Sequence, residues 1–367
     1  MPDCHYCHWL LHVVLRKMGS MGGTRELHGR PGSLSWAALG VVYVAWGLTY
    51  LAIRVGVEHV PPLLLAGVRY LAAGVLLYPA AVRASSRSRR PDAVDRAASR
   101  GRRPRPGVQA WLAGAVVGIL LLVVGNGGVS VAETSLSSGL AAVLVATVPL
   151  WMIIFARLIA HQPVTGPAAA GLAIGLAGVV ILVDSGGASG ALGSVVIVLF
   201  ASASWGLGSV LSHRLALPAN ALVAAAIEMI AGGVVLLAVA AGAGEFGSVR
   251  WSAVPARSWV ALAYLIGPGS ILAFSAFGYA LSRLPVTTVA TYAYVNPVVA
   301  VLAGVLVLGE QLTWREALGA ALVVGAVVIV MTGPRLRRRR AAADDGALAG
   351  QPDGEGCGDR PVPAARS

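Results

Sequence analysis

The stretch VYVAWGLTYLAI at residues 42–53 returns 159 positions later as ASASWGLGSVLS at residues 201–212. The two stretches share Trp-Gly-Leu at the same place, beginning at Trp46 in the first and at Trp205 in the second. Both are apolar and have the length of a helix segment. The chain therefore contains two copies of one apolar unit, and the fold follows from how many helices each copy holds.

Composition indicates that these helices cross a membrane. Hydrophobic residues make up 57% of the 367 residues and charged residues 12%, whereas ordinary globular domains carry about 25% charged residues. A run of about 20 apolar residues spans the hydrocarbon core of a bilayer as a helix. We find ten such runs, at residues 34–53, 62–82, 108–129, 137–158, 166–183, 191–211, 219–241, 258–280, 286–308 and 313–332. We predict an all-α membrane protein with ten transmembrane helices.

Each copy holds five of these runs, and a shift of 148 in the later part of the repeat places Pro149 on Pro297. An odd number of crossings makes the second copy enter the membrane in the opposite direction to the first. Inverted repeats of this kind are typical of secondary transporters. The predicted units are an N-terminal extension (1–32), two inverted five-helix repeats (33–183 and 191–332) and a C-terminal tail (333–367).

The basic residues predict the orientation. If the N-terminus is cytoplasmic, 23 of the 28 lysines and arginines lie in cytoplasmic segments. The positive-inside rule then places both termini in the cytoplasm. No aromatic residue interleaves the arginines of residues 83–105, so we interpret the net charge of +12 as topology and contact with anionic lipids. We predict membrane lipids as partners and no nucleic acid.

The two ends lie outside the repeats. Cys4-His5-Tyr6-Cys7-His8 fits the haem-attachment pattern, but covalent haem attachment needs an exported segment, and this one is predicted to be cytoplasmic. We therefore predict no cofactor and no metal site. Residues 341–367 are rich in Asp, Gly and Pro and are predicted to be disordered.

Two charged residues lie inside predicted spans. Arg69 is in the second run and Glu228 in the seventh, and the shift of 159 superimposes them. Intramembrane charges are costly and face protein or water. One hypothesis is functional, with Arg69 binding a substrate carboxylate and Glu228 binding a coupling proton. The alternative is structural, with the two side chains pairing to lock their helices or with Arg69 snorkelling outward.

Aromatic residues and helix breakers form a second group. Trp46, Trp205 and Tyr292 lie in apolar runs, and the runs containing Asn126 and Asn296 hold glycines or a proline next to the asparagine. Irregular backbone at membrane depth is tolerated where it is buried in protein or lines a cavity. The predicted helix breaks are at Gly127-Gly128, Gly267-Pro268-Gly269, Pro149 and Pro297. They indicate a central site or, alternatively, packing kinks.

Small residues recur at four-residue steps in the fifth and tenth runs, as Gly171 and Gly175 with Gly178, and as Ala317, Ala321 and Gly325. Such rows let helix backbones approach closely in a membrane. We expect packing within the chain, and a homodimer seam is the alternative.

These stretches resemble the EamA-type, ten-helix permeases of the drug/metabolite transporter superfamily, most of all its YedA-type inner-membrane members. The resemblance covers residues 34–332 and is most specific at residues 292–300 followed by Gly309-Glu310. It implies a bacterial plasma-membrane carrier with helices one, three, four, six, eight and nine around its cavity. On that ground we predict a substrate site formed by Trp46, Asn126, Trp205, Tyr292 and Asn296, ahead of Arg69 and Glu228.

No P-loop, H-E-x-x-H or nucleophile-elbow motif is present, so the sequence does not indicate an enzyme. We predict a secondary active transporter, working by alternating access, that exports small amphipathic organic solutes such as amino acids, metabolites or drugs. Coupling is to protons or to an exchanged solute. The alternative function is a lipid-translocating or lipid-binding membrane subunit.

Overall fold

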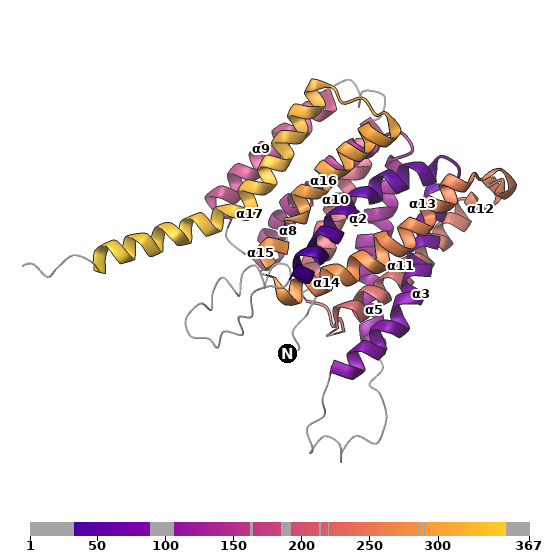
Figure 1. Cartoon of the computed structure of the whole chain (residues 1–367), viewed down its shortest axis with the longest axis horizontal. Coiled ribbons are helices and arrows are strands. Elements are labelled where there is room, and N and C mark those ends of the chain that lie inside the picture. The colour runs from indigo at the N-terminus through magenta and orange to yellow at the C-terminus, as the bar shows by residue number, and fades with distance from the viewer. Residues whose placement is uncertain are drawn as a thin grey trace, which may run out of the picture.

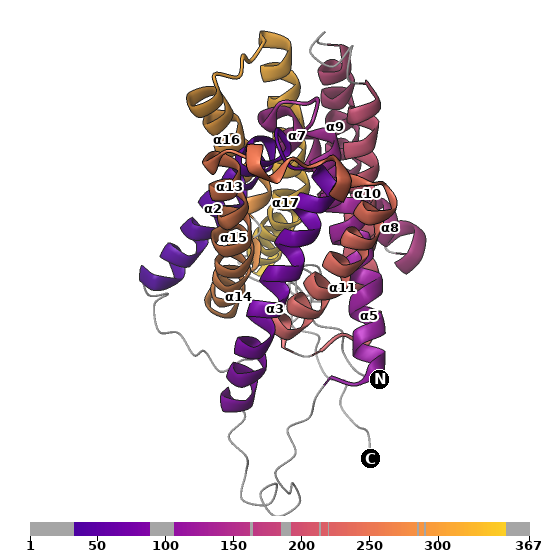
Figure 2. The same ribbon diagram turned by 90° about the vertical axis from the view of Figure 1, so that its right-hand side faces the viewer.

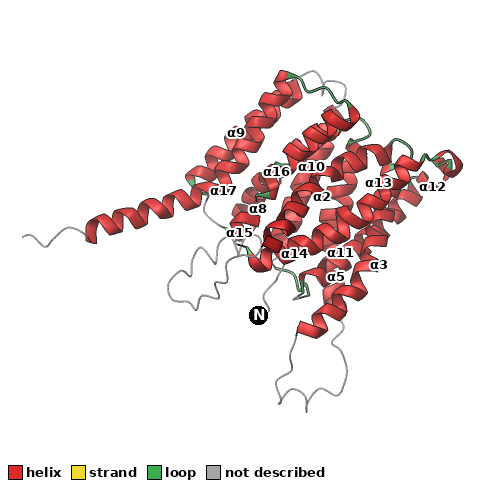
Figure 3. Cartoon of the chain, viewed as in Figure 1, coloured by secondary structure: helices red, strands yellow, loops and turns green. Residues whose placement is uncertain are grey.

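The computed structural model describes residues 33–88, 106–161, 164–184, 192–212, 214–218, 220–284, 286–289 and 291–349. Every regular element in these ranges is a helix, and no strand occurs among them (Figure 3). The all-α class is therefore confirmed for the described part of the chain. The Cys4–His8 motif, residues 89–105 and the last 18 residues lie outside it.

The first copy forms five rods, some of them built from several consecutive elements. In chain order the elements are α2 (Ser33–Val57), α3 (Pro62–Ser88), α5 (Val108–Gly118), η2 (Ile119–Gly127), α6 (Gly128–Ala132), α7 (Ser138–Val145), α8 (Val148–Ala160) and α9 (Gly166–Asp184). Elements α5, η2 and α6 run on without a gap and make up the third rod. Elements α7 and α8 make up the fourth.

The second copy repeats this order. Its elements are α10 (Leu192–Ser212), α11 (Ala221–Gly242), α12 (Glu245–Ser248), η3 (Trp251–Ala253), α13 (Ala256–Ile266), η4 (Gly267–Leu272), α14 (Ala273–Arg283), α15 (Val286–Val289), α16 (Tyr292–Ala303), η5 (Gly304–Leu308) and α17 (Trp314–Ala349). Elements α13, η4 and α14 form the rod that corresponds to α5, η2 and α6.

Seven segments of the described chain are long and apolar enough to cross a membrane, and two shorter apolar helices, at 166–182 and 292–308, accompany them. The described residues thus form a multi-helix apolar bundle that fits a membrane. The last helix, α17, begins at Trp314 and runs to Ala349. Residues 341–349 are helical, so the prediction of disorder from residue 341 is wrong for them. The alanines and the neighbouring arginines are good helix formers, which outweigh the acidic residues that follow.

Corresponding helices of the two copies pack against each other, and they do so antiparallel. On α3, Gly67 lies against Leu237 and Gly74 against Ile230 of α11, while Gly233 of α11 lies against Leu71. Contact positions on α11 therefore fall as those on α3 rise. The two helices lie side by side at one edge of the bundle (Figures 1 and 2).

The second corresponding pair, α9 and α17, is arranged in the same way at the opposite edge (Figure 1). Gly171 lies against Val330, Gly175 against Ala326, and Gly178 against the carbonyl of Gly319. The row of glycines on α9 is thus used for packing within the chain.

The predicted row on α17 does not take part in this contact. Ala317 and Ala321 are exposed, and a Cβ added at Gly325 would meet no atom within 4 Å. The row faces away because the glycines of α9 contact the opposite side of α17. A homodimer through this surface stays a prediction.

The central helices of each copy pack against helices of the other copy. Helix α2 packs against α14 and α16 of the second copy, and α10 packs against η2 and α8 of the first. A Cβ on Gly47 would meet Val299 at 2.5 Å, and one on Gly206 would meet Trp151 at 2.9 Å. These two close approaches correspond to each other under the repeat. Glycine is needed at both because the neighbouring helix leaves no room for a side chain.

Irregular backbone occurs at corresponding places. The π-helical segments η2 and η4 begin at Ile119 and Gly267, positions that the shift of 148 superimposes. Gly127-Gly128 and Gly267-Pro268-Gly269 therefore do mark irregular backbone, as predicted. Single π-helical turns inside α-helices are frequent at functional sites, so these segments direct attention to the centre of the bundle.

The two prolines behave differently from each other. Pro149 lies in the first turn of α8, directly after the break between α7 and α8. Pro297 lies inside α16, so the prediction of a break at Pro297 is wrong. The helix begins only five residues earlier, at Tyr292, directly after the turn at Thr291. The carbonyl that Pro297 leaves without a bond belongs to the first turn of α16, so the helix start absorbs the distortion.

Candidate functional site

An aromatic cluster brings together two of the predicted site residues. The ring of Trp46 on α2 lies 5.0 Å from that of Tyr292 on α16 and 5.3 and 5.0 Å from Phe274 and Phe277 on α14. Tyr292 also lies edge-on to Phe277 at 5.5 Å. Edge-to-face contacts of this kind are the preferred aromatic geometry. The cluster fixes both predicted rings at the contact between the two copies.

Asn296 lies one turn further along α16 and is 8% exposed. No donor among the described residues lies within hydrogen-bond distance of its Oδ1. The main-chain oxygen of Asn296 lies 3.3 Å from where a Cβ on Gly47 would stand, so the residue sits directly against α2. A buried acceptor without a donor costs about 1–3 kcal/mol. Asn296 therefore offers a polar atom that a bound solute could satisfy.

The remaining two predicted residues, Trp205 and Asn126, lie on α10 and η2. The ring of Trp205 on α10 lies 3.0 Å from the Cβ position of Gly125 on η2. Asn126 follows Gly125, and its carbonyl accepts a hydrogen bond from the Ser130 hydroxyl at 3.0 Å. Trp205 and Asn126 thus belong to adjoining elements. Phe274 packs against the same hydrophobic cluster as Trp205 and so connects that cluster with Trp46.

Arg69 points toward the irregular backbone of η4. It is 4% exposed, and its Nε donates to the Ser270 hydroxyl at 3.1 Å. Its guanidinium also lies 4.7 Å above the Tyr70 ring. A Cβ added at Gly269 would lie 3.8 Å from the Arg69 guanidinium and 3.2 Å from Thr49. A buried cation beside a helix break is an arrangement suited to a carboxylate.

Glu228 does not pair with Arg69, so the structural hypothesis of a locking ion pair is wrong. Glu228 is 3% exposed, and its Oε1 has no donor among the described residues. The antiparallel register of α3 and α11 places Glu228 opposite the turn at Leu76 and Arg69 opposite the turn at Val235. That separates the two by about 10 Å along the helices at ~1.5 Å per residue.

Because the pair is absent, the stabilities of the Arg69 and Glu228 variants should be additive. We expect Arg69→Gln and Glu228→Gln together to change the free energy of unfolding by the sum of the single changes, within about 0.5 kcal/mol. Thermal unfolding of the purified protein in detergent measures all four members of the cycle. A coupling energy above about 1 kcal/mol would indicate that Arg69 and Glu228 do pair, and would contradict the register of α3 and α11.

Sequence reasoning assigned no role to two acidic residues. Glu310 follows Gly309, which has a φ of 66° and ends η5. Its carboxylate accepts from the Ser138 and Gly139 amides at 2.8 and 3.3 Å and so caps the start of α7. A Cβ at Gly304 would collide with this carboxylate. The Gly309-Glu310 pair is visible in the sequence, but its capping role is not, because the helix start that it caps lies far from it in the chain.

Glu133, the second of these residues, lies in the turn between α6 and α7 and is 0% exposed. The sequence places it four residues after the predicted run at 108–129, where solvent exposure is the usual expectation. No signal in the sequence indicates that it is buried, because the burial comes from helices of both copies that meet at this turn.

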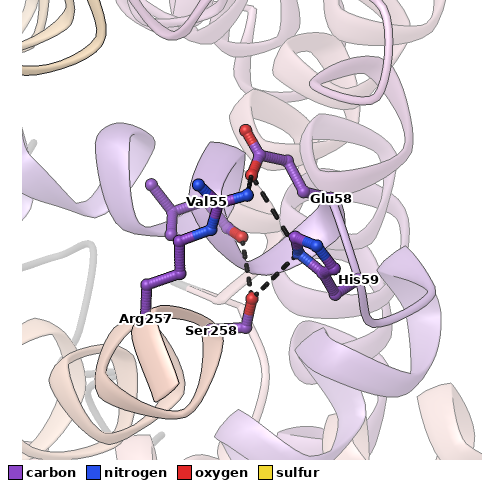
Figure 4. A network of polar contacts seen from close by, with 5 residues as sticks. All are labelled: Val55, Glu58, His59, Arg257 and Ser258. Carbon is purple, nitrogen blue, oxygen red and sulfur yellow. Dashed lines mark hydrogen bonds and ion pairs between the residues drawn. The ribbon is translucent and has the colours of Figure 1, made fainter. Parts of the chain in front are cut away.

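Further polar contacts join the two copies at the end of the bundle that holds the Glu133 turn. We call this the α12 end, after the short helix α12 (Glu245–Ser248) that lies there. The Glu58 carboxylate lies 2.9 Å from the Arg257 guanidinium, and the Ser258 hydroxyl donates to the Val55 carbonyl at 3.3 Å (Figure 4). His59 Nδ1 lies 3.3 Å from the same hydroxyl (Figure 4). These contacts tie the end of α2 to the start of α13.

A pocket opens at the α12 end too, between α7, η5 and α17. Its walls include Leu140, Val143, Val301, Glu310 and Ala320. None of the five predicted substrate residues lines it. The aromatic rings of Trp46 and Tyr292 instead contact each other and their neighbours directly. The site predicted from the sequence is therefore a packed cluster in this conformation, and the pocket is a separate feature.

Sequence comparison identifies relatives along most of the chain. It is 42% identical over 303 residues to the inner membrane transporter YedA of Escherichia coli K12, which covers 82% of this chain and 92% of that protein. It is 24% identical over 306 residues to a chloroplastic WAT1-related protein of Arabidopsis thaliana, covering 81% and 69% of the two. A 31-residue stretch is 58% identical to a probable amino-acid metabolite efflux pump of Salmonella typhimurium.

Structural comparison gives a matching fold. A solved crystal structure superimposes with a TM-score of 0.53 at 20% sequence identity, covering 82% of this chain and 98% of the other. At that identity the match shows only that the two proteins share an arrangement of helices.

The pattern of the EamA-like transporter family matches twice, at residues 34–184 and 192–332. Those two matches include the residues of the aromatic cluster, the segments η2 and η4, and the contact residues of the two antiparallel pairs. Together with the similarity to YedA, which covers 92% of that protein, they establish that this chain is an integral membrane transporter and not an enzyme. The chain belongs to the EamA-like transporter family.

Proposed function

We propose that the chain is a secondary active transporter that exports small amphipathic organic solutes by alternating access, coupled to protons or to an exchanged solute. The proposed location is the bacterial inner membrane, with both termini in the cytoplasm. Amino acids, metabolites and drugs are the proposed substrate classes. One relative, although similar over only 8% of this chain, is a probable amino-acid metabolite efflux pump.

The proposed architecture is ten transmembrane helices in two inverted five-helix repeats. The antiparallel packing of α3 on α11 and of α9 on α17 supports it, since equivalent helices run antiparallel when one copy is turned over. The matching start of η2 and η4 supports it as well. In this orientation the α12 end faces the outside of the cell.

The observation that carries the functional proposal is the position of Asn296. Its buried Oδ1 has no donor among the described residues, and it lies one turn from the Tyr292 ring that contacts Trp46. Aromatic rings bind the apolar part of an amphipathic solute, and an amide orients its polar part. Arg69, held toward η4 by Ser270, supplies a cation for a carboxylate. Trp205 and Asn126 form the proposed opposite wall.

The substrate class can be tested before any substrate has been identified. Untargeted metabolite profiles of cells with and without the gene should show solutes that accumulate inside when the carrier is absent. The strongest candidate is then assayed for transport in proteoliposomes. Exclusive movement of lipid between leaflets, with no solute transported, would favour the alternative function as a lipid translocator.

Changes on α16 should separate binding from folding. We expect Asn296→Ala and Tyr292→Phe each to lower transport by about tenfold or more, equivalent to about 1.4 kcal/mol of lost stabilisation, because each removes a polar group at the site. Val298→Ala is the matched control, since Val298 lies on the same helix and is 49% exposed. Transport in proteoliposomes is measured against the amount of folded protein.

The abundance of each variant distinguishes the two roles. The proposal requires that Asn296→Ala and Tyr292→Phe reach the membrane at the level of the Val298→Ala control. If abundance falls in step with transport, the two residues only pack the bundle.

A further inference from the structure

Glu133 is an acidic residue with no contact for its charge. It lies directly after the Val108–Ala132 span, in the turn before α7, and is 0% exposed. No hydrogen-bond donor among the described residues reaches either carboxylate oxygen. Buried carboxylates are normally paired or hydrogen-bonded, because an ionised one without partners loses its hydration and gains nothing in return.

The nearest cation does not neutralise the carboxylate. The guanidinium of Arg54, on α2, donates to the main-chain carbonyl of Glu133 and not to its side chain. This contact holds the turn between α6 and α7 against α2. Arg54 therefore already contacts the main chain of Glu133, and it can pair with the carboxylate of the same residue if the turn moves.

The other charged or titratable groups around Glu133 come from three elements. Arg69 on α3 and Arg54 favour the ionised form of the carboxyl, and Glu310, which caps α7 from beyond η5, opposes it. Tyr50 on α2 also interacts with Glu133. Burial is the largest influence, and with Glu310 it raises the pKa of the Glu133 carboxyl well above its ordinary value. A neutral carboxyl is therefore the stable form in this arrangement.

We propose that Glu133 is a proton-binding site, occupied when the α12 end of the bundle is closed and emptied when that end opens. The site belongs to the transport cycle, so this inference rests on the proposed function. Its ligand is the proton itself, and neither Arg69 nor Glu228 takes part in binding it.

The contacts at the α12 end explain why protonation and closure are linked. In the closed arrangement, Arg54 binds the Glu133 carbonyl, Glu310 binds the amides of α7, and Glu58 pairs with Arg257 across the copies. Opening separates these elements and admits water to the turn. The Glu133 O–H bond then breaks, the proton passes to water, and the carboxylate pairs with Arg54. Closure reverses the step and takes one proton from the side that the α12 end faces.

Infrared spectroscopy and thermal unfolding of the purified full-length chain in detergent test the proposal. Wild type should show the band of a protonated carboxyl at about pH 6 to 7, well above the ordinary glutamate range, and Glu133→Gln should lose the part of it that belongs to Glu133. Glu316→Gln, at the same end but hydrogen-bonded to the amide and hydroxyl of Thr313 at the start of its own helix, is the matched control and should lose nothing. An unchanged band in Glu133→Gln would overturn the proposal.

The pH dependence of stability has a defined sign. Because the folded state holds the proton more tightly than the unfolded state, the melting temperature of wild type should fall as pH rises above about 4.3, the ordinary value for glutamate. The folding equilibrium should lose up to about tenfold per pH unit from this one site. Glu133→Gln keeps the neutral form at every pH, so its melting temperature should fall less steeply than that of the Glu316→Gln control. Equal slopes for the two variants would overturn the proposal.

Arg54→Gln gives a second test that does not depend on Glu133→Gln folding. Removing the cation that favours the ionised form should move the titration of the protonated-carboxyl band to higher pH. A shift to lower pH, or none, would contradict the assigned environment. These readouts require no substrate. If the titration is as expected but no transport is found, the proposed function is refuted. If transport is found but the titration is not as expected, only the proton site is refuted.

Discussion

Replacing Gly233 with alanine is expected to prevent accumulation of folded protein. A Cβ at this position would lie 2.5 Å from the backbone nitrogen and 2.8 Å from the Cα of Leu71 on α3. Overpacking costs about 1–3 kcal/mol where side chains can move aside. Here the obstacle is backbone, so α3 and α11 must separate, and we expect a cost above about 3 kcal/mol.

Gly242, on the same helix, is the matched control. A Cβ there meets no atom within 4 Å, so Gly242→Ala should be neutral or stabilising by up to about 1 kcal/mol through its higher helix propensity. Membrane abundance and the melting temperature of both variants provide the measurement. Similar melting temperatures for Gly233→Ala and Gly242→Ala would show that the seam between α3 and α11 is not close-packed.

The seam matters because it is where the two copies meet through equivalent helices. The shift of 159 superimposes Gly233 on Gly74, and the structure places both at the contact, each against the opposite helix. The sequence indicates that the two glycines are equivalent, since glycine is needed wherever two backbones approach. The sequence does not indicate which residue each glycine contacts, because that depends on the direction in which the second copy packs.

The same distinction explains the wrong pairing of Arg69 with Glu228. The repeat superimposes them, and superposition indicates equivalent depth on equivalent helices. Antiparallel packing brings together residues at complementary positions, so equivalent residues face each other only near the crossing point. Leu71 and Gly233 lie near that point, whereas Arg69 and Glu228 lie on opposite sides of it.

The candidate site was partly predictable. Aromatic residues beside helix breakers led to Trp46 and Tyr292, which the structure joins at 5.0 Å, and glycine-rich stretches led to η2 and η4. Glu133 could not be found in this way. Its burial depends on α2, α3 and the segment after η5, which lie far from it in sequence, and a single acid at the end of an apolar run looks like an ordinary boundary residue.

The opposed orientation of the two copies is the central claim, and a set of topology reporters tests it most directly. A reporter that works only in the cytoplasm should be active when fused after Arg340 or within residues 85–105. It should be inactive at Gly187, which follows five crossings, and at Gly244, which follows α11 at the α12 end. Expression of each fusion is checked with an antibody against the reporter. Activity at Gly187 would mean that the second copy enters the membrane in the same direction as the first, and would contradict the inverted arrangement.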